Sequence, residues 1–381
     1  MKQRLAILGS TGSIGRQTLD TMRAFPDRFE VVSLTADSNW EALAAQALEF
    51  APDSVVIARK ELYPKLKEAL AHTDVKVYAG HESICSVAAS SGVDTVVNAL
   101  VGYAGFAPSL RALEAGHKLA LANKESLVVG GETVMRAASE HRAPVIPIDS
   151  EHSAVFQSLA GETSPIRRII LTASGGPFLD MTSEEMERVI PGQALRHPRW
   201  TMGPRITVDS ATMLNKGFEV IEARWLFGVD AGRIDVVIHP EAVIHSMVEF
   251  EDGAIKAQMG RPDMHIPIQY ALTFPHRLPV AGAPFDFAAC ASLTFRAPDR
   301  ERFPMLELAY RALESGGNAA CILNAAGEVA VEAFLTRRIG FLEMARIVER
   351  TMDAATFVAQ PTLDDYAASD AEARRLAAEM I

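Results

Sequence analysis

The feature that most restricts the fold is a glycine-rich turn near the start of the chain, between a strand pattern and a helix pattern. Residues 5–8 form a short apolar run, residues 9–15 read Gly-Ser-Thr-Gly-Ser-Ile-Gly, and residues 16–25 have a helical pattern that Pro26 ends. Glycines in such a turn let the backbone approach a pyrophosphate, whose charge is met by N–H groups at the helix N-terminus. The pattern predicts a dinucleotide site, with a tight turn in a ligand-free sheet as the alternative.

Strand and helix patterns alternate over the first 150 residues. A helix is expected over residues 39–50, and strands are expected over residues 29–35, 54–58, 75–78, 95–100, 118–122 and 144–148. This alternation predicts a parallel, doubly wound sheet. We therefore expect an α/β protein whose N-terminal, Rossmann-like domain spans residues 1–150.

Beyond this domain the pattern changes. Residues 168–172 form a short strand pattern, and residues 234–260 predict an antiparallel system with a hairpin at Asp252-Gly253. A central α+β domain is expected over residues 151–278. The loop-rich, proline-containing residues 279–304 predict a linker, and the Ala-, Leu- and Glu-rich residues 305–381 predict a C-terminal helical domain.

Composition excludes several classes of function. A net charge of −11 and no run of Lys or Arg argue against nucleic-acid binding, which needs a concentrated basic surface. No apolar run reaches the about 18 residues that cross a membrane. Three widely spaced cysteines predict neither a disulfide framework nor a thiolate zinc site, and the N-terminal residues lack a signal-peptide pattern. A cytoplasmic protein with a small-molecule ligand is expected.

The end of the second strand pattern bears on cofactor choice. Asp37 follows Gly15 by 22 positions, where a carboxylate would accept the ribose 2′-hydroxyl of NAD. A 2′-phosphate would instead favour Arg or Lys, and residues 35–39 contain neither. The residues alone favour NAD, and a helix N-cap is the alternative role of Asp37.

Two acidic segments predict a metal site. Asp149 and Glu151 follow a strand, and Glu219 lies on a helix expected over residues 209–222. Together they would form an all-oxygen site, which favours Mg²⁺ or Mn²⁺ over zinc. The alternative is a surface loop and a solvated helix face, on which Glu219 shares its side with Asn215 and Glu222.

Several segments could bind a phosphate or close over a ligand. Ser210, Asn215 and Lys216 offer hydrogen-bond donors, and Ser174-Gly175-Gly176 is a candidate anion-binding turn. Residues 197–204 contain Trp200 and Met202 without helical or strand periodicity. They predict either a mobile lid or a loop pinned to the core by Trp200. We interpret the isolated histidines as structural; these are His239, His245 and His265.

These residues resemble one family, 1-deoxy-D-xylulose 5-phosphate reductoisomerase. The matching motifs follow one another along nearly the whole chain: GSTGSIG (9–15), ANKES (122–126), IDSEHSA (148–154), LTASGGPF (171–178), HPRWTMGPRITVDSATMLNKGFEVIEA (197–223), HPEAVIHSMVEF (239–250), KAQMGRPDM (256–264) and LNAAGEVAVEAF (323–334). The resemblance implies a homodimer with a central catalytic domain. It also implies conversion of 1-deoxy-D-xylulose 5-phosphate to 2-C-methyl-D-erythritol 4-phosphate with NADPH and a divalent cation.

Residue roles carry over from this resemblance position by position. The implied metal ligands are Asp149, Glu151 and Glu219, and Lys216 joins Asp149 and Glu151 in catalysis. The implied substrate contacts, besides Glu151, Lys216 and Glu219, are Ser150, Ser174, His197, Trp200, Ser210 and Asn215. The implied NADPH contacts are Thr11, Gly12, Ser13, Ile14, Asn39, Asn123, Lys124, Glu125, Gly203 and Met264.

The chain departs from the family pattern at two places. Asp37-Ser38 stands where many members have Gly followed by Lys or Arg. NADH is therefore expected to replace NADPH less poorly in this protein than in members with that basic residue. Gly327 replaces a usual Asn in a helical segment, without an expected functional effect. Two other functions are kept open: a metal-dependent dehydrogenase of another sugar phosphate, and a non-catalytic dinucleotide sensor.

Overall fold

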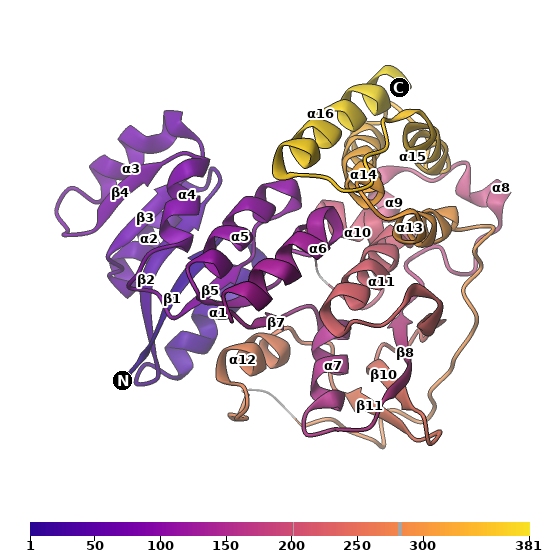
Figure 1. Ribbon diagram of the computed structural model, residues 1–381, viewed down its shortest axis with the longest axis horizontal. Coiled ribbons are helices and arrows are strands. Elements are labelled where there is room, and N and C mark those ends of the chain that lie inside the picture. The colour runs from indigo at the N-terminus through magenta and orange to yellow at the C-terminus, as the bar shows by residue number, and fades with distance from the viewer. Residues whose placement is uncertain (201, 281–283) are drawn as a thin grey trace. The chain divides into compact units, whose positions relative to one another are not determined.

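The computed structural model describes residues 1–200, 202–280 and 284–381, which form two compact units (Figure 1). The first unit comprises residues 1–126, 132–153 and 263–282. The second comprises residues 127–131, 154–262 and 283–381.

A seven-stranded sheet forms the centre of the first unit, in the order β4-β3-β2-β1-β5-β6-β7. Each neighbouring pair is parallel. The strands are β1 (Gln3–Leu8), β2 (Phe29–Ala36), β3 (Ser54–Ile57), β4 (Lys76–Ala79), β5 (Thr95–Asn98), β6 (Lys118–Leu121) and β7 (Val145–Pro147). Most are continuous apolar runs because a parallel sheet is covered on both faces. The predicted Rossmann-like sheet is confirmed.

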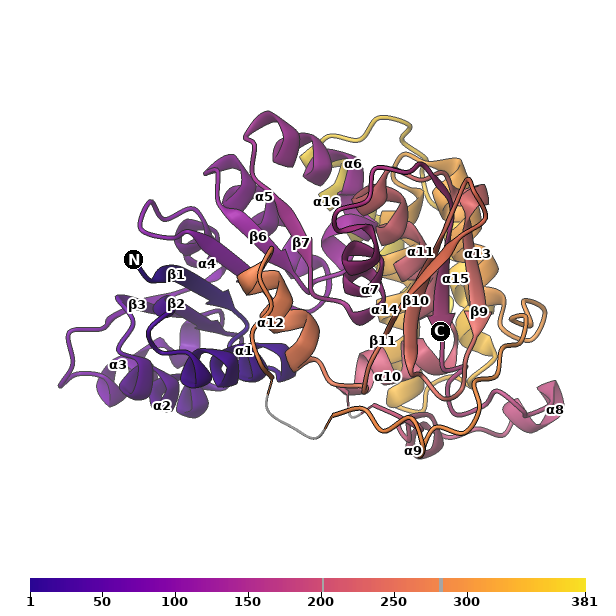
Figure 2. The ribbon, with the colours of Figure 1, turned by 90° about the horizontal axis from the view of Figure 1, so that it is seen from below.

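Helices connect these strands in the order that the sequence pattern predicts. They are α1 (Ser13–Ala24), α2 (Trp40–Phe50), η1 (Lys60–Leu62), α3 (Tyr63–Ala69), α4 (His81–Ala88), η2 (Gly102–Gly105), α5 (Phe106–Glu114) and α6 (Glu125–Glu140). The helix α12 (His265–Thr273) returns to this unit late in the chain, where it packs against α1, β6 and β7 (Figure 2).

The second unit contains a four-stranded sheet in the order β11-β10-β8-β9. Its strands are β8 (Ile166–Ala173), β9 (Ile234–Ile238), β10 (Ile244–Phe250) and β11 (Ile255–Met259). The hairpin predicted at Asp252-Gly253 is confirmed, because β10 and β11 are antiparallel across it. The antiparallel system predicted over residues 234–260 holds for β10 and β11 but is wrong for β9, which pairs parallel with β8. The sequence suggests a hairpin here because only a short loop separates β9 from β10. In the sheet, however, β8 lies between these two strands.

One hydrophobic core joins this sheet to the C-terminal helices. The helices of the unit are α8 (Ser183–Met186), α9 (Pro191–Ala194), α10 (Pro204–Ala211), α11 (Leu214–Phe227), η3 (Ala231–Arg233), α13 (Pro304–Ser315), α14 (Ala319–Leu335), α15 (Glu343–Ala354) and α16 (Leu363–Glu379). The ring centroid of Phe341 lies 5.0 Å from that of Phe178 and 5.7 Å from that of Phe334. A Cβ atom on Gly217 of α11 would lie 2.5 Å from Cβ of Ala309 on α13.

The unit boundaries therefore differ from the domain boundaries expected from the sequence. Residues 305–381 share one core with the four-stranded sheet, and residues 263–278 belong with the first unit. In the intervening segment, described residues 284–303 form no helix and only a single bridge, between Arg296 and Ile238. Within the described ranges, no helix is long and apolar enough to cross a membrane.

Candidate active site

The glycine-rich turn connects β1 to α1 and is closely packed. Gly9 has φ +82°, and a Cβ atom there would lie 2.6 Å from the carbonyl oxygen of Ala99. A Cβ atom on Gly15 would lie 2.3 Å from the Gly9 oxygen. Gly12 is the N-cap of α1, and its cap involves no side-chain hydrogen bond. The predicted cofactor contacts Thr11, Gly12, Ser13 and Ile14 thus lie where backbone N–H groups can meet an anion.

The turn is also tied to the neighbouring strand. The Gly9 N–H donates to Thr35 Oγ1 at 3.0 Å, and the Ser10 N–H donates to the Thr35 carbonyl at 2.8 Å. The Ser10 hydroxyl further bonds Gln46 of α2 at 2.7 Å. Sequence inspection missed this link, because nothing local in the pattern connects Gln46 with the turn.

The side chains of Asp37 and Asn39, which follow β2, both have partners that were not evident from the sequence. Nε of Arg59, which follows β3, lies 3.2 Å from Oδ2 of Asp37. Asn39 Oδ1 accepts from the Ala42 N–H, so this predicted cofactor contact caps α2. Arg59 escaped the sequence analysis because it lies 20 residues beyond Asn39, outside residues 35–39.

The segment after β6 is buried. The side-chain amide of Asn123 donates to the carbonyls of Leu100 and Gly102, both at 3.0 Å, and to Glu125 Oε2 at 2.9 Å. Only 1% of Asn123 is exposed, so its side chain positions the loop after β5. Lys124, which is 8% exposed, places Nζ 3.0 Å from Oδ2 of Asp149.

Asp149 lies just beyond β7, at the start of α7 (Ser150–Leu159). A carboxylate oxygen of Asp149 and one of Glu151 lie within 4.8 Å of each other, and the Ser150 hydroxyl donates to Glu151 Oε2. Burial alone would raise the pKa of Asp149, but Lys124 and His152 outweigh it and hold that pKa far below its usual range. Asp149 is therefore a carboxylate at neutral pH, as a cation ligand must be.

The single helix predicted over residues 209–222 is two helices. α10 ends at Ala211, Met213 has a left-handed φ of 65°, and α11 begins at Leu214. The prediction was wrong at this point because residues 209–222 have apolar positions at helical spacing, which conceals a break of two residues. Ser210 thus lies in the last turn of α10, whereas Asn215 and Lys216 lie in the first turn of α11.

The polar residues of α11 form one buried cluster. Nδ2 of Asn215 lies 2.5 Å from Oε1 of Glu219, and Lys216 Nζ pairs with Oε2 of the same carboxylate. Lys216 is 4% exposed, Glu219 0% and Glu222 3%. The alternative of a solvated helix face is wrong, because these charges are buried. Buried charges require partners or ligands.

Ser174, His197 and the end of α10 come together in the second unit. Nδ1 of His197 accepts from the N–H groups of Arg199 and Trp200 at 3.2 and 2.9 Å. The neutral ring therefore carries its proton on Nε2, which donates to Ser174 Oγ at 3.1 Å. The Gly176 N–H donates to the same oxygen at 3.3 Å, so the Ser174 hydroxyl can direct its own proton toward an anion.

The turn after β8 packs directly on α10. Gly176 has φ +68°, and a Cβ atom there would lie 2.9 Å from the Ser210 carbonyl oxygen. Gly175 also has a positive φ, of 86°. Two successive glycines with positive φ thus hold Ser174 beside the end of α10, and the anion-binding role of this turn stays a prediction.

The predicted lid has defined contacts. Trp200 is half-buried, and its ring centroid lies 6.3 Å from that of His245. Arg199 donates to the Pro240 carbonyl at 2.9 Å. Met202 is half-buried and Gly203 caps α10, whereas Thr201 lies outside the described residues. The loop is thus held by Trp200 and Arg199 in this conformation.

In the first unit, the predicted cofactor contact Met264 is the N-cap of α12 and is half-buried.

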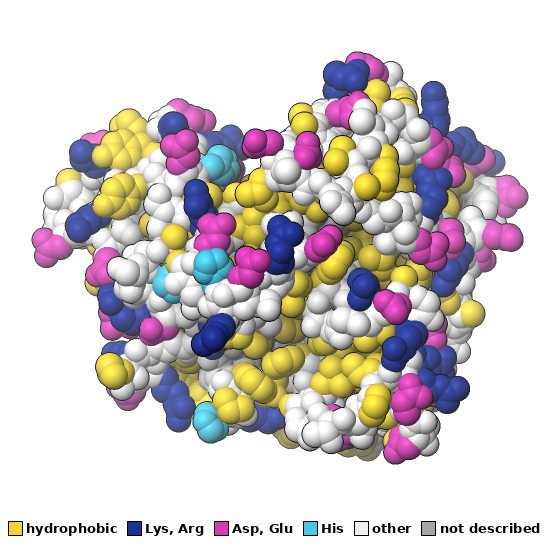
Figure 3. Space-filling view, in the orientation of Figure 1, with side chains coloured by type: hydrophobic (Ala, Val, Ile, Leu, Met, Phe, Trp, Pro, Cys, Tyr) yellow, Lys and Arg dark blue, Asp and Glu magenta, His cyan; other side chains and the backbone are white. Residues whose placement is uncertain are grey.

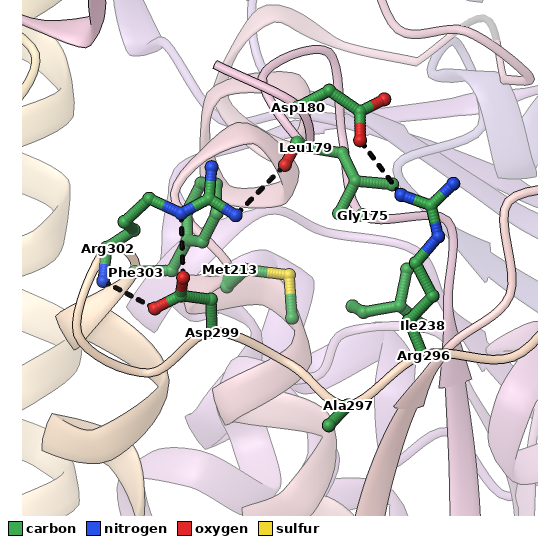
Figure 4. A pocket seen from close by; sticks show the side chains of 10 residues that line it. All are labelled: Gly175, Leu179, Asp180, Met213, Ile238, Arg296, Ala297, Asp299, Arg302 and Phe303. Atoms are coloured by element: carbon green, nitrogen blue, oxygen red, sulfur yellow. Dashed lines mark hydrogen bonds and ion pairs between the residues drawn. The ribbon is translucent and has the colours of Figure 1, made fainter. Parts of the chain in front are cut away.

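A cavity of about 260 Å³ is lined in part by Gly175, from the turn after β8, and by Met213 (Figure 4). Arg296 pairs with Asp180 at 2.8 Å, and Arg302 pairs with Asp299 at 2.8 Å. Because each of the two guanidinium groups already has a carboxylate partner, the cavity carries no net cationic site. Of the predicted site residues within the described ranges, only Gly175 of the candidate anion-binding turn lines it.

Charged side chains of both signs are interspersed over the face shown in Figure 3. This agrees with the absence of any Lys or Arg run in the sequence.

Comparison with known proteins decides the family. Models described as 1-deoxy-D-xylulose 5-phosphate reductoisomerase, its C-terminal domain and the DXP reductoisomerase C-terminal domain match residues 5–131, 145–227 and 259–376, respectively. A 1-deoxy-D-xylulose 5-phosphate reductoisomerase of Bacteroides fragilis is 55% identical over 381 residues, which cover 100% of this chain and 98% of that protein. The chain belongs to the 1-deoxy-D-xylulose 5-phosphate reductoisomerase family. The resemblance drawn from the motifs is confirmed, and the chain is an enzyme.

Solved structures of reductoisomerases match the whole fold. The enzyme of Zymomonas mobilis in complex with NADPH is 44% identical, with a TM-score of 0.93 and coverage of 100% of this chain and 99% of that one. A reductoisomerase in complex with NADPH, fosmidomycin and magnesium is 40% identical, with a TM-score of 0.93 and coverage of 99% and 98%.

Proposed function

We propose that this reductoisomerase converts 1-deoxy-D-xylulose 5-phosphate to 2-C-methyl-D-erythritol 4-phosphate, using NADPH and Mg²⁺ or Mn²⁺. The observation that carries the proposal is a full-length match to reductoisomerases solved with NADPH and magnesium. This chain supplies suitable groups for both: a closely packed glycine turn and carboxylates that are oxygen donors for a hard cation.

Three carboxylates are proposed to hold the cation, as the family resemblance implies: Asp149, Glu151 and Glu219. Asp149 is kept ionised by Lys124, and both oxygens of Glu219 are oriented by Asn215 and Lys216. A bound divalent cation would act as an electrophile toward adjacent carbonyl and hydroxyl oxygens of the substrate.

The phosphate end of the substrate is assigned to donors of the second unit. His197 and the Gly176 N–H both donate to Ser174, which favours donation by the Ser174 hydroxyl to a phosphate oxygen. Ser210 at the end of α10, with Asn215 and Lys216, is proposed to complete the set. Phosphate binding away from the reacting carbons would supply the energy that orders the Trp200 loop over the substrate.

The reacting end is assigned to the start of α7. The Ser150 hydroxyl already donates to Glu151 and can pass a substrate hydroxyl proton to it during rearrangement. Lys216 is proposed to stabilise the charge that develops on a substrate oxygen. NADPH, bound with its nicotinamide near Met264, would supply the two electrons that reduce the rearranged aldehyde.

One assay tests the proposal. Oxidation of NADPH is followed with 1-deoxy-D-xylulose 5-phosphate, with Mg²⁺ and after chelation, and the product skeleton is determined by NMR. Metal-dependent oxidation with a branched product is expected. Oxidation giving an unbranched product would indicate a dehydrogenase of another sugar phosphate, and cofactor binding without turnover would indicate a sensor.

Two further properties belong to this proposal. The three cysteines are all free in the structure, which suits the reducing cytoplasm where NADPH is available. A homodimer is proposed by analogy with the family. Cell fractionation tests the location, and light scattering of the purified protein tests the dimer; a monomer would contradict it.

A further inference from the structure

The ends of β2 and β3 form one polar edge in the first unit. The two strands are parallel neighbours, and Ala36 pairs with Ile57. Pairing continues past both strands, because the Arg59 N–H donates to the Asp37 carbonyl at 3.1 Å. Asp37 and Arg59 therefore emerge side by side, although 21 residues separate them in the sequence.

The side chains of these residues are also paired. Nε of Arg59 lies 3.2 Å from Oδ2 of Asp37, and the two side chains remain 57% and 62% exposed. Such an exposed ion pair contributes only about 0–1 kcal/mol to stability. Within the described residues, Asp37 is the one partner of the Arg59 guanidinium, and it engages Nε alone. The pair thus orients a guanidinium group whose side chain stays more than half exposed.

This edge lies where a dinucleotide places its adenosine ribose. The glycine turn is bonded to Thr35, two residues before Asp37, so the turn and the end of β2 are adjacent. A pyrophosphate on the turn puts the adenosine ribose beside the end of β2. A guanidinium binds a phosphate through two parallel N–H groups, whereas a ribose hydroxyl needs only a carboxylate acceptor.

We infer that Arg59 recognises the 2′-phosphate of NADPH, and that it supplies from β3 the cation that residues 35–39 lack. The inference rests on the proposed function, since it concerns the cofactor of that reaction. It reverses the expectation from the sequence that this enzyme discriminates less strongly against NADH than members with a basic residue after β2. Asp37, instead of accepting a ribose hydroxyl, holds the guanidinium in place.

Equilibrium binding tests this without turnover. Affinities for NADPH, NADH, 2′,5′-ADP and 5′-ADP are measured by calorimetry for the wild type, Arg59→Met and Arg59→Lys. The matched control is Arg111→Met, since Arg111 is a similarly exposed arginine of the same unit, paired with Glu114 at 3.2 Å. Circular dichroism and melting temperature establish that each variant is folded.

Arg59→Met is expected to weaken NADPH and 2′,5′-ADP by about 10- to 100-fold, because charge-assisted hydrogen bonds are lost. NADH and 5′-ADP should be unaffected, Arg59→Lys should be intermediate, and Arg111→Met should match the wild type. Unchanged NADPH affinity in Arg59→Met, or equal wild-type affinity for NADPH and NADH, would overturn the inference and leave the proposed reaction standing. A wild type that binds neither dinucleotide would overturn both.

Discussion

Nζ of Lys124 lies 3.0 Å from Oδ2 of Asp149, with the two side chains only 9% and 18% exposed. The Lys124 ammonium group thus neutralises the Asp149 carboxylate, which we propose as a ligand of the metal ion. The pair explains how Asp149 stays ionised in a largely buried position when no metal is bound.

Lys124→Met should destabilise the metal-free enzyme by about 3–5 kcal/mol, because it leaves a buried carboxylate without its partner. Mg²⁺ should recover part of this loss, since the ion replaces the missing charge. Melting temperature with chelator and with Mg²⁺ measures both effects. Lys65→Met, at an exposed lysine of α3, is the control. An Mg²⁺ shift no larger in Lys124→Met than in the wild type would contradict the assignment of Asp149 as a ligand.

Glu219→Gln should lower metal-dependent turnover by more than about 100-fold, because even outer-shell partners of a metal site contribute about 10- to 100-fold. NADPH affinity should not change. Glu222→Gln is the matched control, because Glu222 is an equally buried carboxylate on the same helix. Activity is measured over a range of Mg²⁺ concentrations. If Glu222→Gln required more Mg²⁺ and Glu219→Gln did not, the ligand assignment would be wrong.

Gly176→Ala should raise KM for the sugar phosphate by at least about tenfold, because one lost phosphate hydrogen bond corresponds to about 1.5–3 kcal/mol. The new Cβ atom would lie 2.9 Å from the Ser210 carbonyl, and its backbone has φ +68°. Gly192→Ala is the control, since a Cβ atom there meets nothing within 4 Å among the described residues. Steady-state kinetics with NADPH saturating provides the measurement. A normal KM in a folded Gly176→Ala would exclude this turn from phosphate binding.

Lys118 should make stability rise with pH above about 8. Burial, which outweighs the opposing effect of Asp94, lowers its pKa to about 8, while Nζ donates to the carbonyls of Ala271 and Leu272. Between this pKa and that of the unfolded chain, the unfolded state binds more protons. Wild type should therefore gain up to about 2 kcal/mol relative to Lys118→Met from pH 8 to 9.5.

Urea unfolding of the first unit measures this difference. Trp40 lies in that unit, so a background with Trp200→Phe and Trp225→Phe leaves it as the only fluorescent tryptophan. A difference that stays constant across this pH range would show that Lys118 has an ordinary titration.

Cys321 should resist alkylation in the folded enzyme, because it is fully buried and burial raises the pKa of its thiol. Iodoacetamide at pH 8 should label the half-buried Cys290 first, and peptide mass spectrometry gives the two rates. Labelling in urea, where both thiols are exposed, is the control. Equal rates in the folded enzyme would be inconsistent with this packing.

Much of the first unit could be predicted from local sequence patterns. The strand, glycine turn and helix at the N-terminus depend on residues close together in the chain, whose periodicity and backbone freedom are local properties. The same holds for the Asp252-Gly253 hairpin and for Asp149 at the end of a strand. The acidic residues and the residues that we propose for phosphate binding were likewise selected from the motifs alone.

Other features depended on which segments pack together. Arg59 reaches Asp37 because β3 lies beside β2. The C-terminal helices share one hydrophobic core with β8, and Phe341, between α14 and α15, packs on Phe178, which follows β8. The chain breaks at Met213 between α10 and α11, and Gly176 packs against Ser210 near the end of α10. The sequence by itself determined the elements and the chemistry available, since these follow from neighbouring residues. Only the tertiary structure decided which charges meet, because strand order and core packing bring together residues that are distant along the chain.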